Sequence, residues 1–113
     1  MNQQLDKNKA SLEDIINACN KCLSFVVGMD FDSFQKDEKT ISAIQHQILV
    51  VGEATKRLTL EFRSQHVNIP WKAMAGMRDI LIHSYDNADL EEIWKTVKIM
   101  PDLITKLSQI TFS

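Results

Sequence analysis

The chain is organised around MRDILIHSY, residues 77–85. Three polar side chains suited to chemistry, Arg78, His83 and Tyr85, lie within this short stretch. Each helical residue turns about 100°, so Arg78 and Tyr85 would fall nearly on one line, whereas His83 would lie roughly 140° from Arg78. Asp79 and His83, four residues apart, would share a face. Either a turn near His83 re-aims its side chain, or a second copy of the chain completes the site.

Outside this stretch, apolar residues recur at three- and four-residue spacing through most of the chain. Only 3 Gly and 2 Pro interrupt the 113 residues, which favours long helices over a many-stranded sheet. The pattern predicts four main helices, which span residues 5–27 (with residue 11 as the alternative start), 38–63, 70–85 and 90–110. We therefore expect an all-α fold, an antiparallel bundle of four main helices in a single domain of residues 1–113.

Capping chemistry marks the ends of these predicted helices. Gly28 directly follows the first helix and accepts the left-handed conformation common at that position. Asp37 and Asp89 are the expected N-caps of the second and fourth helices, because short acidic side chains accept hydrogen bonds from exposed backbone N–H groups. Pro70 suits the first turn of the third helix. Pro101 should break or kink the fourth helix, since it lacks a backbone donor.

A glycine and a glutamate stand together inside the second predicted helix. Gly52 costs about 1 kcal/mol there relative to alanine, and close approach of another helix is the structural reason to tolerate it. Glu53 lies in an apolar segment, where a charge needs a partner, and Arg78 is the predicted partner. Gly76 is expected to let another backbone come close, and the apolar face of the third helix then favours a homodimer.

Composition and charge limit the classes of protein to which the chain can belong. The formal net charge of -2 argues against a general, charge-driven nucleic-acid binder, although a small local basic cleft is compatible with it. No apolar run approaches the roughly 20 residues of a membrane span. The first residues lack the apolar region of a signal peptide. These observations predict a cytoplasmic protein that does not act at a membrane.

Cys19 and Cys22 form a single Cys-x-x-Cys within a helical pattern. A thioredoxin-type site would follow a strand, and a zinc site would need further cysteine or histidine ligands nearby. We therefore expect reduced, partly buried thiols and no metal site. His46 and His66 lie away from residues 77–85, and no function is assigned to them.

Arg78-x-x-x-x-His83-x-Tyr85 resembles the Arg-x4-His-x-Tyr signature of HepT-type toxins in the HEPN superfamily. The segment ILVVGEATK, residues 48–56, is similar to the second helix of that family. The segment IPWKAMAGMRDILIHSY, residues 69–85, is similar to the stretch that leads into its site. The resemblance covers most of the chain.

This resemblance implies an all-α homodimer whose two motif segments face each other across a composite cleft. It implies a metal-independent endoribonuclease without a cofactor, acting on RNA as the toxin of a type VII toxin–antitoxin system. The implied antitoxin is an MntA-type minimal nucleotidyltransferase, which transfers AMP from ATP to Tyr85. Arg78 and His83 would be the catalytic pair, with Asp79 as the polar neighbour of the arginine. Glu53, predicted above as the partner of Arg78, would support them as well.

The residue types suit this chemistry. Cleavage of RNA without a metal needs a base, an acid and positive charge near the phosphate. Histidine, with an unperturbed pKa of about 6.5, can be either acid or base, and the arginine fork matches phosphate oxygens. A two-fold dimer would supply two copies of His83, one for each proton transfer. Arg78 and His83 of one helix then need not point in the same direction, because two chains build the site together.

Other interpretations of the same residues stay open. The chain could be a non-catalytic helical docking partner or substrate of a nucleotidyltransferase, as the low net charge suggests. It could also be a structural dimer in which Arg78, His83 and Tyr85 join the interface. Asp79 is expected to orient His83. Four basic residues are interpreted as a solvated face, with an RNA-binding rim as the alternative: Lys56, Arg57, Arg63 and Lys72.

Overall fold

The computed structural model describes residues 3–83 and 89–112, and only the backbone of residues 4, 5, 80, 82 and 83. All secondary structure in these residues is helical, which confirms the predicted all-α fold. The helices are α1 (Gln3–Phe25), α2 (Phe31–Gln35), α3 (Glu38–Arg57), α4 (Leu60–Ser64), α5 (Trp71–Ala75), α6 (Met77–His83), α7 (Leu90–Lys98) and α8 (Met100–Ser108). None of them combines the length and apolar character that a membrane span requires.

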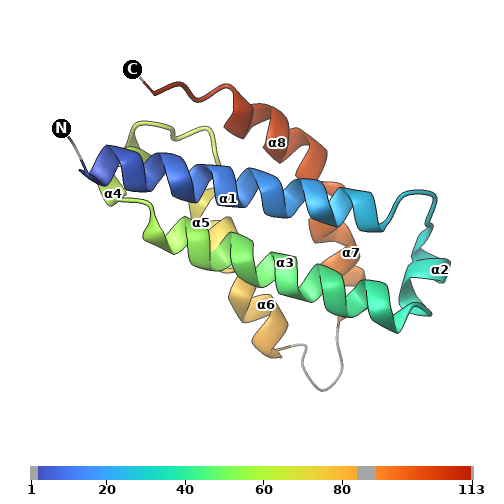
Figure 1. Cartoon of the computed structure of the whole chain (residues 1–113). Coiled ribbons are helices and arrows are strands. Elements are labelled where there is room, and N and C mark those ends of the chain that lie inside the picture. Colours follow the sequence, from blue (N-terminus) through green and yellow to red (C-terminus); the bar gives the residue numbers. More distant parts are fainter. Residues whose placement is uncertain (1–2, 84–88, 113) are drawn as a thin grey trace.

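The two long helices α1 and α3 form the centre of the bundle. They lie side by side and make the most extensive contact between any two described elements (Figure 1). α8 packs against α1, and α5 and α6 pack against α3. α2 connects α1 to α3 and also contacts α7. The motif helix α6 is therefore held by α3, the helix that carries Gly52 and Glu53.

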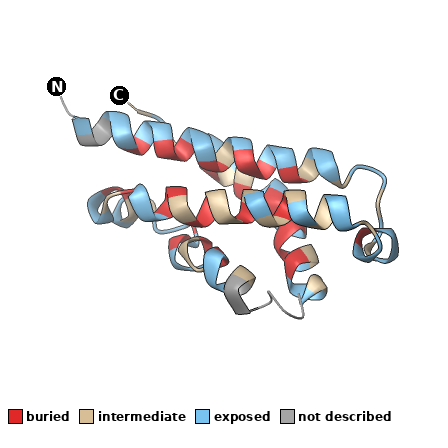
Figure 2. Cartoon of the chain, turned by 60° about the horizontal axis from the view of Figure 1, so that its bottom comes forward, coloured by how far each residue is buried: buried red, intermediate tan, exposed pale blue. Residues whose placement is uncertain are grey.

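The core lies where the apolar stripes of these helices meet. Figure 2 shows the buried residues on the inward faces of α1 and α3, with exposed residues on the outer faces. Among the described side chains, those that are completely excluded from solvent come from five helices and include Ile15, Cys19, Cys22, Phe34, Ile44, Ile48, Val51, Ile93, Met100 and Leu107. Replacing one of the larger aliphatic side chains with alanine typically costs about 2–5 kcal/mol.

Residues 29–36, between the first two predicted helices, contain the short helix α2. Asp30 caps it, and its carboxylate accepts a hydrogen bond from the Ser33 N–H at 2.8 Å. Phe34 is fully buried and its ring lies 4.9 Å from that of Trp94, while Phe31 is half-buried with its ring 6.2 Å from Trp94. Both phenylalanines therefore pack onto the core.

The predicted length of the second helix, residues 38–63, was wrong. This helix ends at Arg57, and a separate helix, α4, begins at Leu60. Leu58 is extended, with ψ 140°, and Thr59 caps α4 through a hydrogen bond from the Phe62 N–H at 3.1 Å. The Asn8 side chain donates to the Thr59 hydroxyl at 3.2 Å and accepts from the Thr59 N–H at 3.0 Å. These bonds satisfy the polar groups released by the break, so the tertiary contact stabilises the turn.

The third and fourth predicted helices are each divided in two. Gly76 separates α5 from α6; its own N–H bonds to the Lys72 carbonyl at 3.0 Å, and its carbonyl accepts the Asp79 N–H at 2.9 Å. Glycine is a weak helix former, which favours a break at this point. In the last helical region, α8 begins at Met100 with Pro101 in its first turn, so the break predicted at Pro101 is confirmed.

The predicted N-caps are present. The Asp37 carboxylate accepts a hydrogen bond from the Thr40 N–H at 3.0 Å, and the Asp89 carboxylate accepts one from the Glu92 N–H at 3.1 Å. The hydrogen bond from Thr40 holds the pKa of Asp37 below its ordinary value of 3.8. Gly28 has a φ of +77°, the left-handed conformation expected after the first helix.

The cap at α3 predicts a pH dependence of stability. Because the folded-state pKa of Asp37 is lowered, its charged form stabilises the fold above the unfolded-state value of about 3.8. This contribution is lost as the pH falls through the lower folded-state value. The variant Asp37→Asn lacks the titrating charge. Denaturant unfolding should show wild type more stable than the variant at about pH 7, with a smaller difference at about pH 3. A difference of equal size at both pH values would contradict this role of the charge.

Candidate active site

The predicted contact between Arg78 and Glu53 is present where α6 meets α3. The Arg78 Nη1 lies 3.3 Å from the Glu53 Oε1, and the two side chains are 48% and 45% exposed. A half-exposed ion pair contributes only about 0–1 kcal/mol to stability. Its main effect is to orient the guanidinium, which keeps its other N–H donors for a further anion.

Gly52 allows α6 to approach α3 at this point. A Cβ at Gly52 would lie 3.2 Å from the Arg78 backbone nitrogen, 3.4 Å from the Arg78 Cβ and 3.5 Å from the Ala75 carbonyl oxygen. The first of these distances is tighter than ordinary contact, so the close approach predicted for Gly52 is confirmed. The neighbours that determine it are the backbone of α5 and α6, on either side of Gly76.

The other motif residues are described to different extents. Asp79 is exposed and makes no ion pair within the part of the chain that the structure describes. His83 is the last residue of α6, but its side chain lies outside the described part, as does the whole of Tyr85. The expected contact between Asp79 and His83, and the placement of Tyr85, therefore stay predictions.

Gly76 has a role within the single chain that was not predicted, and its expected packing against a second copy of the chain stays a prediction. A Cβ at this position would meet only the Lys72 and Ala73 carbonyl oxygens of its own preceding turn, at 3.4 and 3.5 Å. Within the single chain, Gly76 serves as the C-cap of α5. It thereby sets the direction in which α6 leaves α5, a function that the spacing of apolar residues did not reveal.

The two cysteines lie in the core and are not part of the candidate site. Both are free and fully buried, which confirms the expected thiols and shows them to be more buried than predicted. Burial raises the pKa of Cys19 to about 12, and burial together with the charge of Cys19 raises that of Cys22 to about 12. Since the thiolate is the reactive form, both are inert near neutral pH. In residues 3–83 and 89–112, no group of three or more His, Cys, Asp or Glu side chains could hold a metal ion.

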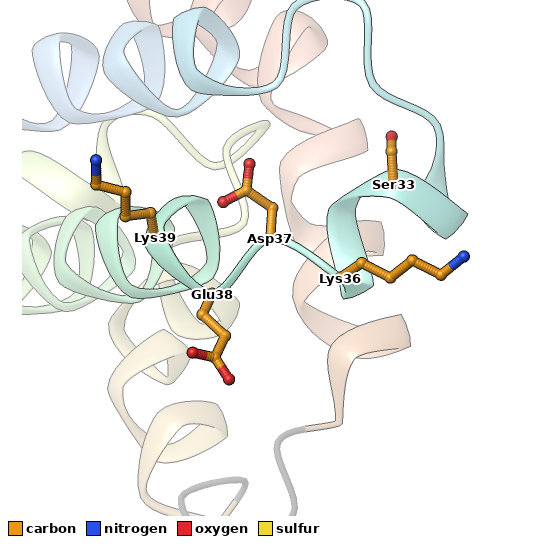
Figure 3. A pocket seen from close by; sticks show the side chains of 5 residues that line it. All are labelled: Ser33, Lys36, Asp37, Glu38 and Lys39. Carbon is orange, nitrogen blue, oxygen red and sulfur yellow. The ribbon is translucent and has the colours of Figure 1, made fainter.

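An open hollow of about 590 Å³ lies at the junction of α2 and α3, away from Arg78. Its lining residues are Ser33, Lys36, Asp37, Glu38 and Lys39. Figure 3 shows the Lys36 and Lys39 ammonium groups pointing to opposite sides, with the Glu38 carboxylate directed away from both. Because these groups do not converge on a common point, the hollow is not a built site.

Comparison with known proteins identifies the family. The model of the family described as "Ribonuclease HepT-like" matches residues 15–110, which include the Gly52–Arg78 contact and all of α6. The chain belongs to the HepT-like ribonuclease family. No solved structure is significantly similar to it.

Individual members of the HepT-like family are similar over most of their length. A protein of Thermococcus cleftensis named "Probable ribonuclease HepT" is 41% identical over 91 residues, 80% of this chain and 83% of that protein. A "Putative RNase" of Caldanaerobacter subterraneus subsp. tengcongensis is 39% identical over 100 residues, 88% of this chain and 89% of the relative. Another "Putative RNase", from Methanocaldococcus jannaschii, is 38% identical over 103 residues, covering 90% and 85%. The all-helical bundle is compatible with the HEPN fold implied by the motif.

The close approach at Gly52 predicts a strong position-specific effect in this HepT-like chain. In Gly52→Val, the added carbons would press on the Arg78 backbone, so the free energy of unfolding should fall by about 1–3 kcal/mol. Gly76→Ala is the matched control, because its Cβ would meet only ordinary contacts and the helical φ of -80° suits alanine. Urea denaturation measures both. Equal stability of Gly52→Val and wild type would show that α3 and α6 do not need this contact.

Proposed function

We propose that the chain is a metal-independent endoribonuclease, the toxin of a type VII toxin–antitoxin system that acts in the cytoplasm. The observation that carries the proposal is the ion pair between Arg78 and Glu53 in a chain of the HepT-like family. Arg78 lies on the short helix α6, which ends at His83. Similar proteins are named as ribonucleases, which supports RNA as the substrate.

The proposed reaction uses the RNA itself as the nucleophile. One His83 imidazole removes the proton of the 2′-hydroxyl, whose oxygen attacks the adjacent phosphorus. The bond to the 5′-oxygen breaks, and the His83 imidazolium of a second protomer donates a proton to that leaving oxygen. The products are a 2′,3′-cyclic phosphate and a 5′-hydroxyl. Each step is a proton transfer or a displacement, so no oxidant or co-reactant is required.

Arg78 would stabilise the negative charge that builds up on the phosphate. Its guanidinium carries five N–H donors, and the ion pair with Glu53 engages Nη1. The half-exposed side chain therefore retains donors that can bind phosphate oxygens in the forked geometry typical of arginine. In this proposal Glu53 is a positioning residue, and Asp79 orients His83 in the same way.

We further propose that a minimal nucleotidyltransferase antitoxin inactivates the enzyme through Tyr85. The tyrosine oxygen would attack the α-phosphate of ATP, forming tyrosyl-AMP and releasing pyrophosphate. The added nucleotide would bring bulk and negative charge beside the motif, where it would exclude RNA and repel its phosphates. The position of Tyr85 two residues after His83 supports this form of control.

RNA cleavage in EDTA tests the catalytic assignment. His83→Ala and Arg78→Ala should each lose about 100-fold or more of the activity, because each removes a proton-transfer group or a charge-stabilising donor. Matched controls are His46→Ala, an exposed histidine of α3, and Arg57→Ala, whose side chain is also 48% exposed and pairs with Asp14 at 3.0 Å. Intact mass must show that all proteins lack AMP.

Two results would contradict the assignment. Cleavage by His83→Ala at the wild-type rate would remove His83 from the mechanism. No cleavage of several RNAs by clean, unmodified wild type would favour the second candidate, a non-catalytic docking partner and substrate of a nucleotidyltransferase. The net charge of -2, unusual for a protein that binds RNA, is the observation that favours this alternative.

The composite site predicts a homodimer. One protomer supplies a single His83, so two protomers are required for the acid and the base. Light scattering at micromolar concentration should give twice the 13.0 kDa mass of the protomer. A monomeric mass in a preparation that cleaves RNA would rule out a site shared between two chains.

A further inference from the structure

The structure divides the four basic residues predicted on one face into two kinds. Arg57 pairs with Asp14, and the Arg63 Nη2 donates to the Lys56 and Leu58 carbonyl oxygens at 3.3 and 3.1 Å. Both arginines are therefore engaged by groups of the same chain. The ammonium groups of Lys56 and Lys72, by contrast, are exposed and have no ion-pair or hydrogen-bond partner among residues 3–83 and 89–112.

Lys56 lies on α3 and Lys72 lies on α5, and both of these helices contact α6, which carries Arg78. Lys56 follows Gly52 by four residues, which on a helix places it about 40° around and about 6 Å along α3. Lys72 lies one helical turn before Ala75, whose carbonyl oxygen borders Gly52. Lys56 and Lys72 therefore each lie about one helical turn from a residue at the contact of α3 with α5 and α6.

The remaining unpaired lysines provide a contrast. α1 carries Lys7, Lys9 and Lys21, and α7 carries Lys95. Lys39 lies in the first turn of α3, about 20 Å along the helix from Gly52. Lys98 lies over the ring of Trp94, 4.8 Å from its centroid. Lys36 and Lys106 are engaged with aspartates on their own helices. On α3, α5 and α6, the helices that meet at Gly52, the unpaired lysines nearest to this contact in sequence are Lys56 and Lys72, in a chain whose overall charge is negative.

We propose that Lys56 and Lys72 form a phosphate-binding rim that holds the RNA backbone next to Arg78. This inference rests on the proposed ribonuclease function and assigns how the substrate is held. Lysine is a compact, mobile point charge, so the rim binds phosphates without reading the bases. Each phosphate that it neutralises releases a counterion, which makes the rim's contribution dependent on salt. The rim explains how a protein of net charge -2 binds a polyanion locally.

The test compares two double variants that remove the same charge from different places. Lys56→Gln/Lys72→Gln removes the rim, and Lys21→Gln/Lys39→Gln is the matched control. The probe for binding is a single-stranded 2′-O-methyl RNA, which lacks the attacking hydroxyl and is not cleaved. The rim variant should bind roughly tenfold more weakly, and its slope of log affinity against log salt should fall by about 1.4, or about 0.7 per contact. The control should match wild type.

Cleavable RNA adds a second measurement. The rim variant should raise KM while kcat at saturating RNA stays near that of wild type, since the rim does not touch the reacting atoms. Restoring the charge with Lys56→Arg/Lys72→Arg should restore binding. If wild type cleaves RNA but both double variants bind alike, the rim is overturned and the ribonuclease stands. If wild type neither binds nor cleaves RNA, both proposals fail.

Discussion

Burial of the apolar stripes between α1 and α3 is the interaction on which the rest of the structure depends. These two helices form the longest contact in the bundle, and their inward faces hold most of the fully buried residues of the core. Apolar area removed from water contributes about 25 cal/mol per Å², so a long, continuous contact is the largest stabilising term available to a chain of this size. The shorter helices attach to this pair and contribute less contact among themselves.

The position of the candidate site follows from that central pair. α3 buries one side against α1 and presents Gly52 and Glu53 on another, where the backbone of α5 and α6 comes into contact. Because Gly52 has no side chain, the backbone of α6 comes close to α3. The Glu53 carboxylate then orients the Arg78 guanidinium. A backbone contact fixes its neighbours more closely than a contact between long side chains. The arginine of the motif is consequently placed by the core and not by a loop.

Sequence reasoning succeeded where a structural feature depends on local chemistry. The caps at Asp37 and Asp89, the left-handed Gly28 and the break at Pro101 all follow from one residue and its immediate neighbours. The contact of Glu53 with Arg78 could also be predicted, because a charge within an apolar segment requires a partner.

The features that were missed depend on distant parts of the chain. The break at Leu58 is stabilised by Asn8, which lies 51 residues before its partner Thr59. The spacing of apolar residues does not indicate that contact. The division at Gly76 was hidden because apolar spacing continues through it. A shared site between two protomers depends on a second molecule, and the roles of His83 and Tyr85 depend on side chains outside the described residues. These parts of the candidate site accordingly stay predictions.

The packing of α8 against α1 has a consequence for how the protein folds. This contact joins segments from opposite ends of the sequence, whereas α1 and α3 are separated only by a short connection that includes α2. Closing a longer loop costs more chain entropy, although the cost grows slowly with length. We expect the α1–α3 hairpin to form early and the docking of α8 to come late.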